Sequence, residues 1–162
     1  MDAAGAARMV DVSDKDTTVR EAVAEGRIRV SPAALRLARS GRLKKGGVVE
    51  VARLAGVMAA KRTSEVIPLC HPLPLTHADV DVRPERGGFR IVARVRTLAR
   101  TGAEMEALHA VAVAALTVYD MVKAADKAMV IDGVRLVRKT GGRSGAWSLP
   151  AAKPRPRARR SR

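Results

Sequence analysis

The amino-acid sequence predicts an α+β plait, in which an antiparallel four-stranded sheet carries helices packed on one face. Three observations lead to this fold class. Several segments alternate between apolar and polar residues, as half-buried strands do. Other segments repeat apolar residues at the spacing of a helix. The segments follow the order strand, two helices, two strands, helix, strand, which suits an antiparallel sheet with helices on one face.

The length of 162 residues favours a single domain that is large enough to bury a core. We expect a flexible N-terminal arm over residues 1–17, one α+β domain over residues 18–149, and a basic, disordered tail over residues 150–162. The arm is small and polar and has no sustained period. The tail consists largely of Pro, Arg and Ala, a composition that cannot bury enough apolar surface to fold.

The first part of the domain is predicted to contain a strand and two helices. Residues 20–30 alternate with period two and predict a half-buried strand. Ser31 and Pro32 are typical of an N-cap and a first helical turn, and Gly41 is typical of a helix C-terminus. Apolar residues form one stripe over about 48–64, which predicts a second helix.

A proline-rich segment, Ile67–Leu75, follows the second helix. Its three prolines fix φ and remove three backbone N–H donors, so neither a helix nor a central strand is expected. The segment is almost wholly apolar, and its one strongly polar side chain is His71. We expect a stiff turn against the core, which is either a wall of a small-molecule pocket or a buried connector with a satisfied histidine.

The second part of the domain is predicted to contain a hairpin, a long helix and a final strand. Residues 78–96 alternate on both sides of a turn and predict an antiparallel hairpin, whose exposed arginines we give no role. Thr101 and Glu104 match a capping box that opens the longest helix, from about 103 to 126. Residues 129–139 form the last predicted strand.

The composition limits the class of protein. A formal net charge of +15 favours an anionic partner, without deciding between a nucleotide and a nucleic acid. The three aromatic residues leave little for base stacking, so we expect no specific nucleic-acid partner. The single cysteine, Cys70, excludes a disulfide within the chain and fits a reducing, cytoplasmic compartment. The absence of a long apolar run or a leader predicts no membrane span.

Acidic and basic side chains on the longest predicted helix are the first candidates for chemistry. Asp120 and Lys123 lie three residues apart and are therefore surface neighbours. They are either an ordinary ion pair or a carboxylate and an amine placed for proton transfer, with a lysine that neighbouring cations make easier to deprotonate. Glu106 lies fourteen residues before Asp120, which is roughly 21 Å along a helix. A site that uses both carboxylates would therefore be shared between two subunits.

Other patterns are less specific. The turn Lys44–Gly47 has the composition of a phosphate-holding turn before a helix, but it lacks the order of a Walker loop. One cysteine and three histidines form no ligand ladder of the usual spacing, so no metal site is expected. Cys70 is a conceivable nucleophile, but apolar surroundings raise the pKa of a thiol and make it inert.

Several of these segments together resemble one enzyme family, the cyclic pyranopterin monophosphate synthases, or molybdenum cofactor biosynthesis protein C (MoaC) family. The resemblance runs in order over nearly the whole chain, to about Trp147. The segments that carry it are Ala6–Ser13, Lys45–Gly46, Ala59–Thr63, Ile67–Leu73, Thr101–Leu108, Ala114–Lys123 and Gly141–Gly145. The proline-rich segment combined with Glu-Met-Glu and Tyr-Asp-Met-x-x-Lys is the most specific part.

This resemblance implies a lyase of molybdenum cofactor biosynthesis. Its substrate is the cyclic dihydro-GTP intermediate made by a radical-SAM partner, and its products are cyclic pyranopterin monophosphate, a pterin, and pyrophosphate. The resemblance further implies a ferredoxin-like plait, no organic cofactor, and a homohexamer built as a trimer of dimers with inter-subunit active sites. Whether Mg²⁺ accompanies the triphosphate stays open. A non-catalytic nucleotide- or nucleic-acid-binding protein is the alternative.

The positions that match the family's motifs also imply roles for single residues. By this resemblance the catalytic residues are Asp120, Lys123 and Lys45. The substrate-binding residues are Leu69, Cys70, His71, Met105 and Glu106, together with Arg20 and Lys61 as phosphate-binding cations. Arg143 stands where the family commonly has lysine, which keeps the charge but changes the geometry toward phosphate.

Overall fold

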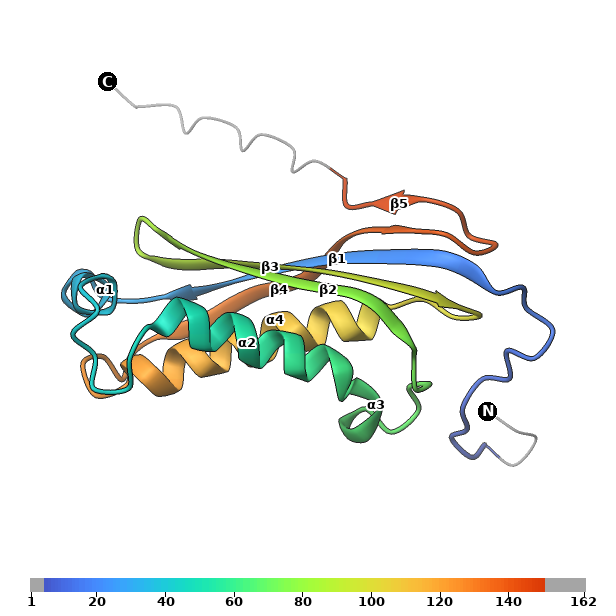
Figure 1. The fold of residues 1–162 in the computed structure, drawn as a ribbon, viewed down its shortest axis with the longest axis horizontal. Helices are drawn as coiled ribbons and strands as arrows, with labels where there is room; N and C mark the ends of the chain where they lie inside the picture. The colour runs from blue at the N-terminus through green and yellow to red at the C-terminus, as the bar shows by residue number, and fades with distance from the viewer. Residues whose placement is uncertain (1–4, 151–162) are drawn as a thin grey trace, which may run out of the picture.

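The structure is a computed structural model that describes residues 5–150. It contains a five-stranded antiparallel sheet in the order β2-β3-β1-β4-β5, with helices along one face (Figure 1). The strands are β1 (Thr18–Arg29), β2 (Leu75–Glu85), β3 (Gly88–Ala99), β4 (Val130–Thr140) and β5 (Trp147–Ser148). The helices are α1 (Pro32–Arg39), α2 (Val48–Lys61), α3 (Thr63–Val66) and α4 (Glu104–Val122).

This architecture confirms the predicted α+β fold and is consistent with a ferredoxin-like plait. The prediction of four strands was wrong by one short strand. β5 pairs antiparallel with the end of β4, where Trp147 lies opposite Lys139 and Ser148 opposite Arg138. A strand of two residues is too short to show alternation in the sequence, so only its pairing reveals it.

Residues 5–17 contain no helix or strand, and β1 begins at Thr18. The division into an arm, a domain and a tail stays a prediction, and residues 151–162 of the predicted tail lie outside the described part of the chain. The proline-rich segment forms neither a helix nor a strand up to Leu75, as predicted. A backbone bond from Cys70 N to Ile67 O, 3.0 Å long, closes a turn within it.

The predicted start of α1 is confirmed. The Ser31 Oγ accepts a hydrogen bond from the Ala34 N–H at 3.4 Å, and Pro32 occupies the first helical turn. Gly41 follows the C-cap with a positive φ of 70°, a conformation that glycine adopts without strain. The second predicted helix is divided by a turn at Arg62 into α2 and the short α3.

The predicted capping box at the start of α4 was wrong. The N-cap is Ala103, and no side chain bonds the first backbone N–H groups. Thr101 lies two residues too early, while the Glu104 Oε1 accepts a hydrogen bond from Lys139 Nζ of β4 at 2.9 Å. The Glu104 side chain therefore pairs with Lys139 of a distant strand instead of capping its own helix. α4 also ends at Val122, earlier than the predicted Asp126.

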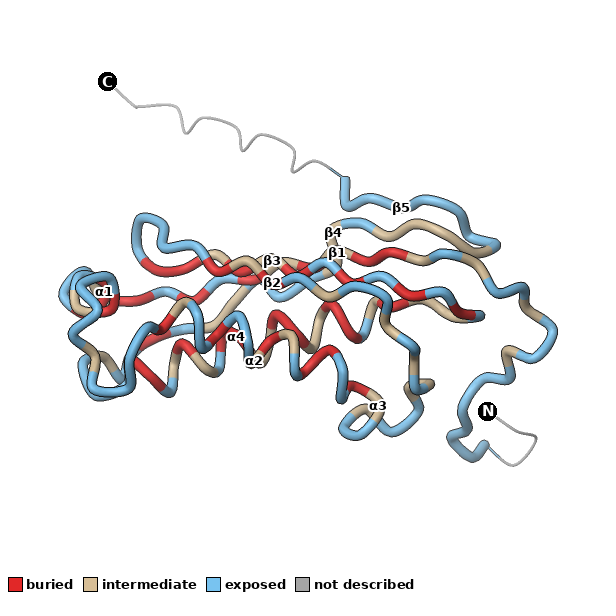
Figure 2. The backbone as a smooth tube through the Cα atoms, in the orientation of Figure 1, coloured by how far each residue is buried: buried red, intermediate tan, exposed pale blue. Residues whose placement is uncertain are grey.

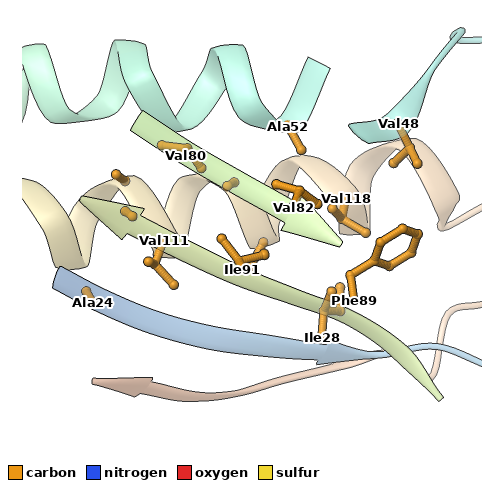
Figure 3. Packing of buried hydrophobic residues seen from close by; sticks show 14 of the residues in the cluster. Ala24, Ile28, Val48, Ala52, Val80, Val82, Phe89, Ile91, Val111 and Val118 are labelled. Atoms are coloured by element: carbon orange, nitrogen blue, oxygen red, sulfur yellow. The ribbon is translucent and has the colours of Figure 1, made fainter. Parts of the chain in front are cut away.

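The core lies between the sheet and the helices (Figure 2). Aliphatic side chains, many of them alanine and valine, fill it (Figure 3). α4 contributes Ala107, Ala110, Ala114 and Ala115, each with no exposed surface. Such residues let backbones approach closely, because little side-chain volume separates the elements. Gly56 allows the same close approach between α2 and α4, because a Cβ at this position would lie 2.9 Å from the Ala110 carbonyl oxygen.

α4 is also the one helix within residues 5–150 that is long and apolar enough to cross a membrane, judged by length and composition alone. Half of its apolar window is buried inside the protein. α4 packs along α2 and against strands β1, β3 and β4. These contacts are typical of the central core helix of a globular domain.

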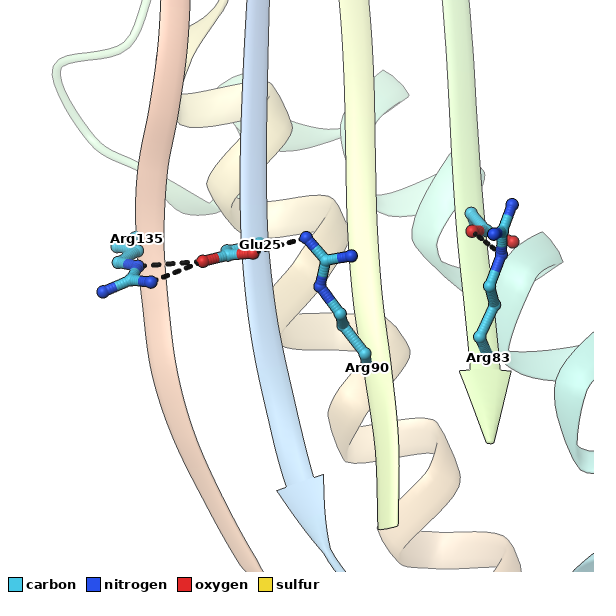
Figure 4. Close-up of polar contacts among 5 residues, drawn as sticks. Glu25, Arg83, Arg90 and Arg135 are labelled. Carbon is cyan, nitrogen blue, oxygen red and sulfur yellow. Dashed lines mark hydrogen bonds and ion pairs between the residues drawn. The ribbon is translucent and has the colours of Figure 1, made fainter. Parts of the chain in front are cut away.

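The face of the sheet opposite the helices carries charged ladders across β3, β1 and β4. The Glu25 carboxylate accepts hydrogen bonds from Arg90 at 2.8 Å and from Arg135 at 2.6 Å (Figure 4). Glu21 pairs in the same way with Arg96 and Arg138. The hydrogen bond from Arg90, then that from Arg135, holds the pKa of Glu25 below its usual value. These arginines thus neutralise carboxylates that the strand register places between them.

Candidate active site

Three candidate residues meet at the C-terminal end of α4. Asp120 binds Lys123, three residues later on the same helix, through an Oδ1–Nζ contact of 2.8 Å. Its Oδ2 lies 2.5 Å from Nζ of Lys45, which comes from the loop between α1 and α2. The predicted proximity of Asp120 and Lys123 is confirmed, and Lys45 completes a cluster that we call the Asp120 cluster.

The charges in the Asp120 cluster support one another. Hydrogen bonds from Lys123 and then Lys45 lower the pKa of Asp120 to about 2, so its carboxylate is ionised at neutral pH. The Asp120 carboxylate in turn raises the pKa of Lys123. The expectation that neighbouring cations make Lys123 easier to deprotonate was therefore wrong, because the nearer carboxylate dominates. At rest the cluster holds an anionic acceptor and a protonated donor.

A cavity of about 390 Å³ adjoins the Asp120 cluster. Leu37, Leu43 and Met121 form its apolar side, and Arg42 and Lys44 add positive charge beside Lys45. The turn at Lys44–Gly47 is closed by a bond from Gly46 N to Leu43 O and leads directly into α2, with Gly47 as its N-cap. This turn therefore lies beside the cavity, as a phosphate-holding turn would.

A second group of candidates gathers at the other end of α4, around the proline-rich segment. Leu69, Cys70, His71 and Met105 line one cavity of about 340 Å³. The N-terminal arm contributes Val10, Val12 and Lys15 to the same cavity. His71 thus lines the wall of a cavity, and its role in binding a small molecule stays a prediction.

Glu106 lies behind this cavity and is only 2% exposed. The Cys70 thiol donates a hydrogen bond to its Oε1 at 3.5 Å, and its Oε2 has no hydrogen-bond partner among the described residues. Burial raises the pKa of Glu106. Burial and the neighbouring Glu106 raise the pKa of Cys70 to about 11, so the thiol stays protonated and is a poor nucleophile.

A third cavity, of about 560 Å³, joins the second along Lys15, Thr101, Gly102 and Glu104. Its cations converge from five separate places in the sequence and define what we call the cationic groove. They are Lys15, Arg20, Arg100, Lys139 and Arg143. The sequence reveals no spacing that unites them, because the arm, three strand ends and the final glycine-rich turn meet only in the fold.

Arg20 is fixed within the cationic groove. Its Nε donates a hydrogen bond to the Ala99 carbonyl oxygen at 3.0 Å. Its guanidinium lies against Gly142, where an added Cβ would come within 2.1 Å of Nη1. Gly142 also has a positive φ of 71°. The glycine-rich turn therefore leaves room for the side chain of Arg20.

Lys61 lies outside these cavities, and Glu106 does not line them either. Lys61 is exposed at the last position of α2, next to α3, and is absent from the walls of the three cavities above. The single chain also keeps the Asp120 cluster apart from Glu106 and His71, because they lie at opposite ends of α4 (Figure 1).

Comparisons with known proteins show the family of this chain. Residues 9–142 match the MoaC family. A cyclic pyranopterin monophosphate synthase of Thermomicrobium roseum is 60% identical over 149 residues, which cover 91% of this chain and 90% of that protein. Synthases of the same name from Chloroflexus aggregans and Methylobacterium sp. (strain 4-46) are 59% and 58% identical and cover 91% and 94% of this chain, and 90% and 96% of their own lengths. This chain therefore belongs to the MoaC family.

Proposed function

We propose that this chain is a cyclic pyranopterin monophosphate synthase, a lyase that acts in molybdenum cofactor biosynthesis. It converts the cyclic dihydro-GTP intermediate into cyclic pyranopterin monophosphate and releases pyrophosphate. The observation that carries this proposal is the Asp120 cluster, with an ionised carboxylate between two lysine ammonium groups, in a chain about 60% identical to enzymes of that name. Rearranging the purine and ribose requires proton donors and acceptors, which the cluster supplies.

Each part of the molecule has a place in this reaction. Lys123, whose pKa is raised, starts as the proton donor, and the ionised Asp120 starts as the acceptor. Lys45 holds the carboxylate of Asp120 and offsets negative charge on the substrate.

The cationic groove, with Arg20, suits a triphosphate, with or without Mg²⁺. Leu69, Cys70, His71 and Met105 form the wall for the rings, with Glu106 behind it. Lys61 adds a phosphate contact from the end of α2. No organic cofactor takes part.

The active site is shared between two subunits of a cytoplasmic homohexamer, built as a trimer of dimers. Two observations support a second copy. The Asp120 cluster and the His71 cavity lie at opposite ends of α4, too far apart for one small ligand. Met105, Leu116 and Asp120 also share one exposed face of α4. The apolar Leu116 lies in the middle of this face, and the candidate residues Met105 and Asp120 lie near its two ends. Antiparallel packing of this face on its copy brings Asp120 of one subunit toward Met105 of the other.

The test is incubation with the cyclic dihydro-GTP intermediate, followed by assays of pyrophosphate and of an oxidised, fluorescent pterin. Asp120→Asn and Lys123→Ala are expected to lower turnover by at least about 100-fold, since each removes one proton-transfer group. Both variants stay folded, because the two side chains are more than half exposed. Lys127→Ala, an exposed lysine nearby, is the control and keeps normal turnover. Bound nucleotide without pyrophosphate release would instead indicate a nucleotide-binding protein.

A further inference from the structure

Asp126 joins two segments that are distant in the sequence. It follows α4 in the turn that leads to β4. Its Oδ2 accepts a hydrogen bond from the Ser31 backbone N–H at 2.7 Å, and its Oδ1 accepts one from the Ala128 N–H at 2.9 Å. The backbone bonds from Ser31 and then Ala128 lower the pKa of Asp126, so it is ionised at neutral pH. Hydrogen bonds to an ionised acceptor are stronger than those between neutral groups.

The two segments joined by Asp126 form opposite walls of the cavity beside the Asp120 cluster. Ser31 is the N-cap of α1, and α1 leads through Leu37 to the loop that carries Lys45. Asp126 itself lies three residues after Lys123. The Tyr119 hydroxyl donates to the Lys127 carbonyl at 3.0 Å and ties the same turn to α4. The start of α1 is thus anchored to the end of the helix that carries Asp120 and Lys123.

Other contacts of α1 do not fix this position in the same way. Ala34, Leu35 and Ala38 are buried, and their apolar contacts hold α1 on the core. Such contacts are non-directional, so they resist separation more than they resist sliding or rotation. The bond from Ser31 to Asp126 is directional and joins the start of α1 to the turn after α4, whereas the neighbouring bond from Val30 N to Gly87 O joins it to the turn between β2 and β3. Lys45 stays 2.5 Å from Asp120 only if the loop after α1 keeps its place.

We propose that Asp126 is a positioning residue, which holds the Lys45 loop against α4 so that Lys45 contacts Asp120. The contacts described above support the position of the Lys45 loop. The effect of Asp126 on turnover rests on the proposed function. Asp126 touches no reacting group and acts through its hydrogen bonds with Ser31 and with the Ala128 backbone N–H.

The direct test measures the Asp120 carboxyl in the folded protein by NMR titration. The pKa of Asp120 is about 2 because Lys123 and Lys45 both bind it. In Asp126→Ala the Lys45 contact loosens, and the pKa of Asp120 rises toward the ordinary 3.8. Asp132→Ala removes an exposed ion pair with Arg29 of β1 and serves as the matched control, with no change at Asp120. A folded Asp126→Ala protein whose Asp120 titrates at the same pH as in the wild-type protein would overturn the proposal.

A second pair of variants changes Ser31, the donor of the hydrogen bond to Asp126. Ser31→Pro removes the N–H that Asp126 accepts, and the φ of −60° at Ser31 is compatible with proline. Ser31→Ala loses the side-chain cap and the weaker side-chain hydrogen bond to Asp126, but it keeps that N–H. We expect Ser31→Pro, but not Ser31→Ala, to raise the pKa of Asp120. Equal values in the two variants would contradict the proposal, even if Asp126→Ala fails to fold.

Kinetics separate a positioning role from a purely structural one. Asp126→Ala should lower kcat for pyrophosphate release by roughly 10- to 100-fold with less than about a 3-fold change in KM, since misplaced catalytic groups slow the reaction step. Asp126→Asn keeps one acceptor oxygen and should recover part of kcat. A lower denaturation midpoint with unchanged kcat would refute the catalytic part. If the wild-type protein releases no pyrophosphate, the proposed function fails while the titration still tests the bond.

Discussion

The pKa values of two carboxylates on one helix are shifted in opposite directions by their surroundings. Asp120 is exposed and lies between two ammonium groups, which lower its pKa to about 2. Glu106 is buried beside a thiol, and burial raises its pKa. The sequence could predict the Asp120–Lys123 contact, because residues three apart on a helix are neighbours. The contacts of Asp120 with Lys45 and of Glu106 with Cys70 depend on loops, so no spacing could predict them.

The Cys70–Glu106 contact leads to a prediction about thiol reactivity. Burial first, then Glu106, raises the pKa of Cys70 to about 11. Glu106→Gln removes the negative charge but keeps the burial, so the thiol pKa falls and the fraction of thiolate rises. We expect alkylation by iodoacetamide at pH 8.5 to become several-fold faster, because the thiolate is the form that reacts. Glu104→Gln should leave the rate unchanged, and an unchanged rate in Glu106→Gln would contradict the assigned contact.

At the scale of elements, alternation and helical stripes predicted the order of the main strands and helices. Predictions from local sequence patterns were wrong or incomplete where contacts between distant residues determine the structure. The capping box at Thr101 was wrong because Glu104 binds Lys139 of a distant strand. The exposed arginines were given no role because the sequence does not contain the strand register. Only the register shows that β1 carries Glu21 and Glu25 between arginines of both neighbouring strands.

The Glu25 ladder makes stability depend on pH. The pKa of Glu25 is lower in the folded protein than its ordinary value of 4.5, so its ion pairs stabilise the fold above about that pH. This contribution is lost as the pH falls through the folded pKa. Glu25→Gln should cost about 1–2 kcal/mol at pH 7, a range discounted because its arginine partners are partly exposed. The cost should shrink at acidic pH in urea denaturation.

A matched control for Glu25→Gln is available on the edge strand. Asp81 pairs with the highly exposed Arg83 of β2, which lies beyond Arg90 in Figure 4. Asp81→Asn should change stability by less than about 0.5 kcal/mol at either pH, as exposed ion pairs usually do. If Glu25→Gln lost equal stability at neutral and acidic pH, the ladder would not be its cause.

The close contact of α2 with α4 leads to a second prediction at this scale. Gly→Ala within a helix normally adds about 1 kcal/mol of stability. At Gly56, however, the new Cβ would lie 2.9 Å from the Ala110 carbonyl oxygen and 3.1 Å from the Val80 methyl groups. We expect Gly56→Ala to lose about 1–3 kcal/mol in chemical denaturation, because the helices must move apart. Ala55→Gly gives the propensity cost alone, and a stabilised Gly56→Ala would contradict the packing described here.

At the scale of the whole molecule, the chain holds its candidate residues in two places. Fold class and function followed from the sequence, the latter through its family motifs, since both depend on long, ordered patterns. The division of the site followed from helix geometry, because fourteen residues of α4 separate Glu106 from Asp120. What the sequence could not reveal is the cationic groove, because its residues meet only after folding.

A shared site predicts complementation between inactive variants. His71→Ala and Asp120→Asn damage opposite ends of the molecule, so a mixed dimer keeps one intact site of its two. Random pairing should restore about a quarter of wild-type pyrophosphate release when the variants are co-expressed. Asp120→Asn mixed with Lys123→Ala is the control and should restore nothing, because both lie in one cluster. Absence of any recovery in the first mixture would contradict an inter-subunit site.

The contact of the Arg20 guanidinium with Gly142 predicts which mutations the gene tolerates. Gly142 has no side chain and no chemistry of its own, yet any replacement would push the guanidinium out of its place. A mutational screen for molybdenum-enzyme activity should therefore rank Gly142 among the least tolerant positions of the chain. Suppressors of such alleles should arise at position 20 as lysine, a narrower side chain that relieves the collision and keeps the positive charge of the groove, and not among the residues that move protons.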